Sequence, residues 1–92
     1  MTKLINYRTY KLDKSKVTPI DRRSDFGNPY KINSKCTREQ SIEAYRGYFE
    51  WRIKTDSWWR GEIEKLKGKT LGCWCTPLPC HGDIILEYLA TV

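Results

Sequence analysis

The sequence predicts a small three-layer α/β domain with a short sheet of about three strands and about three helices. The 92 residues, 39% of them hydrophobic, are enough for one compact core and no second domain. Three short runs have the alternating or apolar character of strands, and three longer runs repeat apolar residues at helical spacing. The chain, residues 1–92, is therefore expected to form a single α/β domain.

The strands are expected near residues 4–10, 17–22 and 69–74. The first run alternates bulky and polar side chains of β-favouring types. The last is largely apolar and follows a turn residue, as is typical of a buried strand. Pro19 cannot donate a hydrogen bond to a neighbouring strand, so the second run is expected at an edge of the sheet.

The helices are expected near residues 38–54, 57–67 and 81–90. Thr37 and Gln40 match a capping box, in which each side chain bonds a backbone amide of the other residue. The third helix has the broad apolar stripe of a helix that packs on a sheet, formed by Ile84, Ile85, Tyr88 and Leu89.

The aromatic residues of the first two helices have two interpretations. Tyr45, Phe49 and their neighbours alternate with arginines, which would suit stacking on nucleic acid bases. An amphipathic helix with its aromatics in the core is the commoner arrangement. Trp58 and Trp59 cannot both point inward from one helical turn, so one of them is expected at an exposed interface.

Composition favours some partners and disfavours others. Seventeen Lys and Arg against eleven Asp and Glu give a net charge of +6, which suits phosphate-bearing partners, nucleic acid included, or simply a soluble surface. No run approaches the ~20 apolar residues of a membrane helix, and Met1-Thr2-Lys3-Leu4 does not resemble a signal peptide. We therefore expect a cytoplasmic protein whose four cysteines are reduced.

Residues 72–83 carry the densest chemistry, in the order GCWCTPLPCHGD. This segment is predicted to join the last strand to the last helix, and α/β folds commonly bind ligands at the carboxyl ends of strands. One interpretation is a zinc site formed by Cys73, Cys75, Cys80 and His81. Its spacing is unfavourable, because adjacent helical residues point about 100° apart. The expected cofactor is therefore none or zinc.

A second interpretation of the same segment is catalytic. Cys80 lies where the helix starts, so its thiolate would be stabilised by the helix dipole, with His81 as acid or base and Asp83 orienting the imidazole. A third interpretation is a binding loop that uses the helix N-terminus for an anion. It would employ Cys73, Trp74, Cys75 and His81. The purely structural alternative has Asp83 capping the helix and the cysteines packed in the core.

The loop at residues 21–34 is the second candidate segment. Two guanidiniums can bind phosphate or carboxylate, and Asn28 can bond the edge of a base or an amide. The alternative is a sharp turn in which Gly27 has a positive φ, Asn28 bonds its own backbone and Pro29 sets the exit. The ligand-binding residues expected here are Arg22, Arg23, Ser24, Gly27, Asn28 and Pro29.

Together the two segments resemble a family of small phage and bacterial proteins with a domain of unknown function. Its hallmarks are an Arg-x-Ser-x-x-Gly-Asn-Pro loop and a downstream Gly-Cys-Trp-Cys-x-Pro-x-Pro-Cys-His-Gly-Asp segment. The resemblance extends over about residues 4–89 and implies that both segments contribute to one site, but it implies no reaction. The motif positions are Arg22, Ser24, Gly27, Asn28, Pro29, Cys73, Cys75, Cys80, His81 and Asp83.

These features predict a protein that binds a small phosphorylated, nucleotide-like ligand. If it is phage-encoded, it would sequester a nucleotide signal in the host cytoplasm as an anti-defence protein. The alternatives are an enzyme that acts on a nucleotide or nucleobase through Cys80 and His81 or a zinc centre, and a DNA- or RNA-binding accessory protein. The exposed edges of a small sheet, with an exposed tryptophan, also favour a homo-oligomer.

Overall fold

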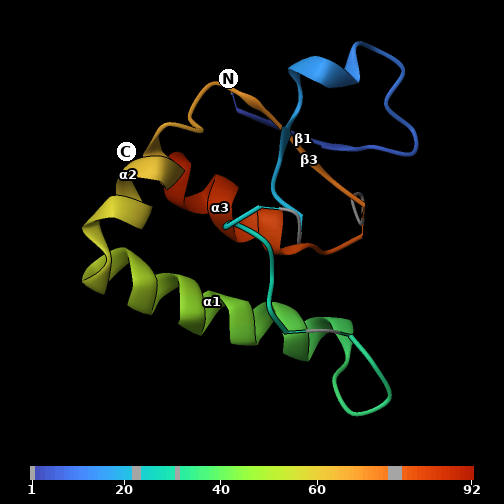
Figure 1. Ribbon diagram of the computed structural model, residues 1–92. Helices are drawn as coiled ribbons and strands as arrows, with labels where there is room; N and C mark the ends of the chain where they lie inside the picture. The colour runs from blue at the N-terminus through green and yellow to red at the C-terminus, as the bar shows by residue number, and fades with distance from the viewer. Residues whose placement is uncertain (1, 22–23, 31, 75–77) are drawn as a thin grey trace.

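The computed structural model describes residues 2–21, 24–30, 32–74 and 78–92 and confirms a small α/β domain (Figure 1). Its helices and strands are, in chain order, β1 (Lys3–Asn6), the short 3-10 helix η1 (Lys14–Lys16), β2 (Thr18–Pro19), α1 (Arg38–Thr55), α2 (Ser57–Glu64), β3 (Thr70–Cys73) and α3 (His81–Leu89). None of the helices in these ranges has the length and apolarity to cross a membrane.

The strands form a parallel three-stranded sheet in the order β1-β3-β2. Leu71 of β3 lies opposite Leu4 of β1 and Thr18 of β2, so β3 is the central strand. Its apolar sequence agrees with that position, since a central parallel strand is buried on both faces. The prediction that Pro19 confines its strand to an edge is confirmed.

The first strand is shorter than expected because a turn follows Asn6. The backbone amides of Thr9 and Tyr10 both donate to the Asn6 carbonyl, at 3.1 and 2.9 Å. The Asn6 side-chain oxygen also accepts from the amide of Arg8, at 2.8 Å. Asparagine commonly forms such local bonds, which compete with strand pairing. The predicted strand over 4–10 therefore ends at Asn6.

The second strand is also shorter than the predicted range of 17–22. Beyond it, the amide of Ile20 still donates to the Gly72 carbonyl, at 3.1 Å. A turn follows at once, because the amide of Ser24 donates to the Asp21 carbonyl at 3.0 Å. The chain thus leaves the sheet beside the end of β3.

The helices cover one face of the sheet, with α3 packed on β1 and α1 packed on α3 (Figure 1). A Cβ added to Gly82 of α3 would lie 2.8 Å from the side-chain ends of both Leu4 and Ile20, so a larger residue there would displace them. Buried Tyr7 and Val17 cover the opposite face, against Gly72. The three layers are therefore the segment around η1, the sheet and the helices.

The aromatic residues of the helices divide between core and surface. Tyr45 and Phe49 of α1 and Trp59 of α2 are buried in the main core, which confirms the core interpretation. Trp58 is 60% exposed, so one tryptophan of the pair does lie on the surface. The predicted capping box of Thr37 and Gln40 is present at the start of α1.

The second helix ends at Glu64, before the expected end at residue 67. The amides of Leu66 and Lys67 donate to carbonyls three residues back, so the chain continues in tight turns. Gly68 then has φ +85°, a conformation that favours glycine. These turns lead directly into β3.

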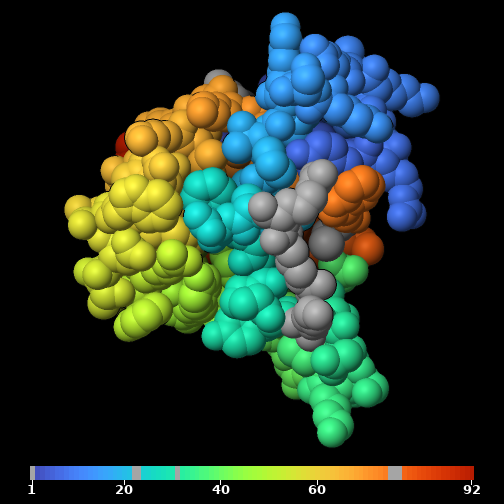
Figure 2. Space-filling model, in the orientation of Figure 1, coloured from blue at the N-terminus to red at the C-terminus, as the bar shows by residue number. Residues whose placement is uncertain are grey.

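The segment before α1 contains a tight turn closed by a bridge between Asn33 and Cys36. Figure 2 shows it protruding, in green, beyond the body of the domain. Cys36 contacts its own chain neighbour, with its thiol 3.7 Å from the Thr37 carbonyl.

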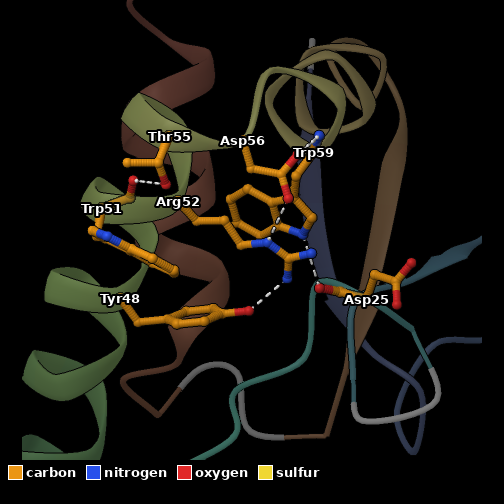
Figure 3. A network of polar contacts seen from close by, with 7 residues as sticks. All are labelled: Asp25, Tyr48, Trp51, Arg52, Thr55, Asp56 and Trp59. Atoms are coloured by element: carbon orange, nitrogen blue, oxygen red, sulfur yellow. Dashed lines mark hydrogen bonds and ion pairs between the residues drawn. The ribbon is translucent and has the colours of Figure 1, made fainter.

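A polar network connects α1, α2 and the loop that follows β2 (Figure 3). Arg52 donates to the Tyr48 hydroxyl at 2.6 Å and to Asp56 at 3.3 Å, and its guanidinium carbon lies 4.8 Å from the Trp59 ring centroid. Trp59 in turn donates its indole N–H to the Asp25 carbonyl, at 3.0 Å. The loop is thereby attached to the corner between the two helices.

We expect Gly72→Ala to destabilise the fold by about 1–3 kcal/mol, the usual cost of overpacking. Its Cβ would lie 2.6 Å from Val17 and closer still to the Tyr7 ring. Urea unfolding measures the difference, with Gly47→Ala as the control, because a Cβ on Gly47 of α1 meets nothing within 4 Å. Equal stability of the Gly72 variant and the wild type would contradict the packing described.

We expect Asp56→Asn to lower stability most at neutral pH. The hydrogen bond from the Trp59 amide, followed by the contact with Arg52, holds the pKa of Asp56 below its ordinary 3.8. A depressed pKa means that the carboxylate contributes fully above 3.8 and loses its contribution as the pH falls through the folded-state pKa. The deficit of the variant, measured by urea unfolding, should therefore shrink in acid. A deficit that does not change with pH would contradict this role.

Candidate functional site

A cavity of about 540 Å³ lies where the end of β3, the start of α3, the loop after β2 and the first turns of α1 meet. Figure 2 shows the teal and green residues that precede and begin α1 on the same face as the orange residues after β3. Of the predicted site residues, the cavity lining includes Asn28, Cys73, Trp74, Cys80 and His81. Residues of both predicted segments thus line one cavity.

His81 is the first residue of α3 and is only 8% exposed. Its Nε2 lies 2.6 Å from the carbonyl oxygen of Ile20. Because a carbonyl can only accept a hydrogen bond, Nε2 carries the proton. In the neutral ring Nδ1 is then an acceptor, and it lies 3.6 Å from the Sγ of Cys80. The ring is therefore placed with its basic nitrogen toward a thiol.

Tyr45 packs its ring against His81, edge to face, with 5.1 Å between centroids. Its hydroxyl donates to the Phe26 carbonyl at 2.9 Å. Burial, with smaller effects from Tyr48 and Cys80, raises the pKa of the Tyr45 phenol. Tyr45 thus stays protonated at neutral pH and acts as a hydrogen-bond donor that attaches the loop to α1.

Cys80 is the N-cap residue of α3 and is 2% exposed. Its Sγ accepts from the amide of Gly82 at 3.4 Å. Asp83 completes a capping box, since its carboxylate accepts from the Cys80 amide at 3.0 Å. This is the capping role that the sequence offered for Asp83 as the structural alternative. The group that orients the His81 ring through Nε2 is the carbonyl of Ile20.

Asn28 attaches the loop to α1 at the cavity. Its side-chain amide donates to the Ser41 hydroxyl at 2.9 Å and to the Ser41 carbonyl at 3.3 Å. Its side-chain oxygen accepts from the Tyr30 amide at 2.9 Å, so the expected bond to its own backbone segment is also present. Asn28 therefore lines the cavity and also holds the loop against α1 through its hydrogen bonds.

The neighbouring motif residues form the turn. Ser24 accepts from the Phe26 amide at 3.2 Å and donates to the Asp21 carbonyl at 3.0 Å. The expected positive φ at Gly27 is wrong: among the described residues the glycine with a positive φ is Gly68. The Gly27 amide instead donates to the Ser24 carbonyl, which closes a turn without that conformation. Ser24, Gly27 and Pro29 are not among the described residues of the cavity lining.

Three predicted site residues, Arg22, Arg23 and Cys75, lie outside the described residues. Within the described ranges, no three His, Cys, Asp or Glu residues are grouped as a metal site would require. The Nε2 of His81 already bonds the Ile20 carbonyl, so a metal at this ring would bind Nδ1, which lies 3.6 Å from the Cys80 thiol. The described members of the predicted zinc set, Cys73, Cys80 and His81, do not form such a group of three.

The cavity also has lining residues that the sequence analysis did not select. They come from the loop after β2, from the segment before α1 and from the first turns of α1, and are Asp21, Tyr30, Ile32, Arg38, Ser41 and Ile42. Arg38 donates to the Pro79 carbonyl at 3.2 Å, and Trp74 donates its indole N–H to Asp21 at 3.0 Å. Arg38 could have been found, because it follows the predicted N-cap of a helix that starts beside the candidate loop.

Comparison with known proteins agrees with the resemblance read from the motifs. The family model described as a domain of unknown function (DUF4326) matches residues 5–91. An uncharacterized 12.4 kDa protein of the nrdA-td intergenic region of Enterobacteria phage T4 is 42% identical over 72% of this chain and 60% of its own length. An uncharacterized protein of Acanthamoeba polyphaga mimivirus, R718, is 31% identical over 70% of this chain and 52% of its own.

The chain thus spans between half and two thirds of these relatives, at 60% and 52% of their lengths. No solved structure matches the chain. The family model, in contrast, extends over residues 5–91 and so includes both motif segments and every helix and strand from β2 to α3. The chain belongs to the DUF4326 family.

Proposed function

We propose that the protein binds a small phosphorylated, nucleotide-like ligand in the cavity between the Asn28 loop and the start of α3. The cavity volume of about 540 Å³ lies within the usual range for small-molecule sites. The observation that carries the proposal is that one cavity contains a guanidinium, a carboxylate and an exposed indole, from Arg38, Asp21 and Trp74. A nucleotide has a phosphate for the guanidinium, N–H or hydroxyl groups for the carboxylate and a planar base for the indole.

The aromatic side chains support binding of a planar base. Trp74 is 54% exposed at the cavity although it packs on Tyr7, with 5.2 Å between ring centroids. Tyr30 is 41% exposed on the opposing segment. Stacking of a base on an aromatic ring is worth about 1–3 kcal/mol. Either ring is available for it.

The charged side chains support the remaining parts of a nucleotide. Arg38 can donate to a phosphate from the first turn of α1, and the net charge of +6 attracts anions to the whole molecule. Asp21 can accept from the N–H groups of a base or from a ribose hydroxyl. At the start of α3, by contrast, the amides of Cys80 and Gly82 bond Asp83 and Sγ. Arg38 is thus better placed for the phosphate than this helix N-terminus.

The biological part of the proposal is that a phage form of this protein sequesters a nucleotide signal of its host, in the host cytoplasm. The relative from Enterobacteria phage T4 supports a viral setting. Sequestration needs tight binding, which is consistent with a cavity whose lining residues come from two segments far apart in the chain. A homo-oligomer, formed at the outer edges of β1 or β2, would add binding sites without changing this cavity.

We expect calorimetry with a panel of mono-, cyclic and dinucleotides to find at least one ligand, and Arg38→Gln to weaken its binding about tenfold or more. Arg60→Gln is the matched control, because it removes the same charge from an exposed residue of α2 that is not in the cavity lining. The proposal fails if no nucleotide of the panel binds, or if both variants weaken binding equally.

Salt dependence separates this proposal from the nucleic acid alternative. Contacts with many phosphates make affinity fall steeply with salt, whereas one phosphate contact changes it little. We expect the affinity for the best nucleotide to fall by less than about tenfold between low and moderate salt. Single-stranded DNA or RNA that binds tightly with a steep salt dependence, while nucleotides do not bind, would favour the accessory-protein alternative.

A further inference from the structure

The described part of the cavity contains one thiol with a base directly beside it. Cys80 and His81 both line the cavity, and Sγ lies 3.6 Å from Nδ1, within the range of a hydrogen bond to sulfur. Neighbouring residues rarely direct their side chains at one another within a helix. Here they do because Cys80 is the extended N-cap residue, with φ −144° and ψ 151°, whereas His81 is already helical.

The carbonyl of Ile20 determines which nitrogen of the neutral His81 ring carries the proton. It accepts from Nε2 at 2.6 Å, and so leaves the lone pair of Nδ1 directed at the thiol. The same arrangement with the proton on Nδ1 would leave Nε2 and a carbonyl as two facing acceptors. A buried pair of acceptors is unfavourable, so the neutral ring is held in the form that can remove a proton from Cys80.

Capping alone does not account for a cysteine at this position. Ser, Thr, Asp and Asn are the preferred N-cap residues, because their oxygens are strong acceptors, whereas a thiol is a weak one. A serine here would accept the Gly82 amide more strongly than Sγ does at 3.4 Å. A thiol at this position is, however, a much better nucleophile than a serine hydroxyl.

We propose that Cys80 is a nucleophile, with His81 as its base, that forms a covalent bond to ligands carrying an electrophilic carbon in the cavity. The thiol proton passes to Nδ1 as Sγ attacks the carbon. An S–C bond forms, the bond from that carbon to its leaving group breaks, and the electron pair leaves with that group. The proton on Nδ1 then passes to the leaving group or to water. No oxidant or reductant takes part.

This inference goes beyond the proposed function, because it can be tested with a small alkylating reagent whether or not any nucleotide binds. Iodoacetamide is small enough for a cavity of about 540 Å³ and reacts by the same displacement, with iodide as the leaving group. In the folded wild-type protein, Cys36 serves as the internal reference for the labelling rate of Cys80. Cys36 is half-buried and contacts the Thr37 carbonyl, whereas Cys80 is 2% exposed.

Two variants separate chemistry from folding. Cys80→Ser keeps an acceptor for the Gly82 amide, so thermal stability should be equal to or above that of the wild type. His81→Gln supplies an amide N–H for the Ile20 carbonyl but has no basic nitrogen near Sγ. Circular dichroism verifies that both variants are folded before labelling.

The experiment measures the rate of carbamidomethylation of each cysteine in the folded protein by mass spectrometry. Trypsin leaves Cys73, Cys75 and Cys80 in one peptide, because no Lys or Arg follows Lys69, so fragment spectra must locate the label. Burial alone predicts that Cys80 reacts more slowly than Cys36. Activation predicts that Cys80 reacts about tenfold faster or more. His81→Gln should slow Cys80 by a similar factor and leave Cys36 unchanged.

Either of two results would overturn the proposal. One is a wild-type Cys80 that is labelled no faster than Cys36. The other is a folded His81→Gln variant whose Cys80 reacts at the wild-type rate. If His81→Gln does not fold, the ratio of the labelling rates of Cys80 and Cys36 in the wild type still tests the proposal. Binding of nucleotides with an unreactive Cys80 would reject the nucleophile and leave the proposed function standing.

Discussion

The hydrogen bond between His81 and the carbonyl of Ile20 is the interaction on which the site depends. It joins the residue that leaves β2 to the residue that begins α3, at 2.6 Å. The contact is possible because Gly82 lets α3 approach the side chains of Leu4 and Ile20. Since Ile20 also donates its amide to Gly72 of the central strand, the sheet, the loop and the helix meet at one residue.

The rest of the site follows from the position of Ile20. The chain after Ile20 forms the loop, which three contacts then attach to the helices: Asn28 to Ser41, Tyr45 to Phe26, and Trp59 to Asp25. The loop thereby becomes one wall of the cavity, and the thiol of Cys80 lies on another. The lining of the cavity thus comes from widely separated parts of the sequence.

Local sequence signals predicted much of this structure, and the remainder depends on one local turn that periodicity does not reveal and on contacts between distant residues. The capping box of Thr37 and Gln40 and the core aromatics of α1 depend on neighbours within a few turns, so periodicity and spacing reveal them. The early end of β1 depends on side-chain bonds of Asn6 that compete with pairing. The predicted N-cap at Thr37 places Arg38 at the start of α1, but the contact of Arg38 with Pro79 joins residues 41 positions apart and has no local signal.

Nitrogen NMR of the imidazole ring tests the account most directly, and the sequence contains one histidine, so the signals need no assignment by mutation. A long-range nitrogen–proton correlation spectrum distinguishes the two neutral ring forms. We predict the form with its proton on Nε2, protected from exchange by the Ile20 carbonyl, and an unprotonated Nδ1 beside Cys80. A ring with its proton on Nδ1, or one that averages rapidly between both forms, would contradict the position of His81 and with it the shape of the site.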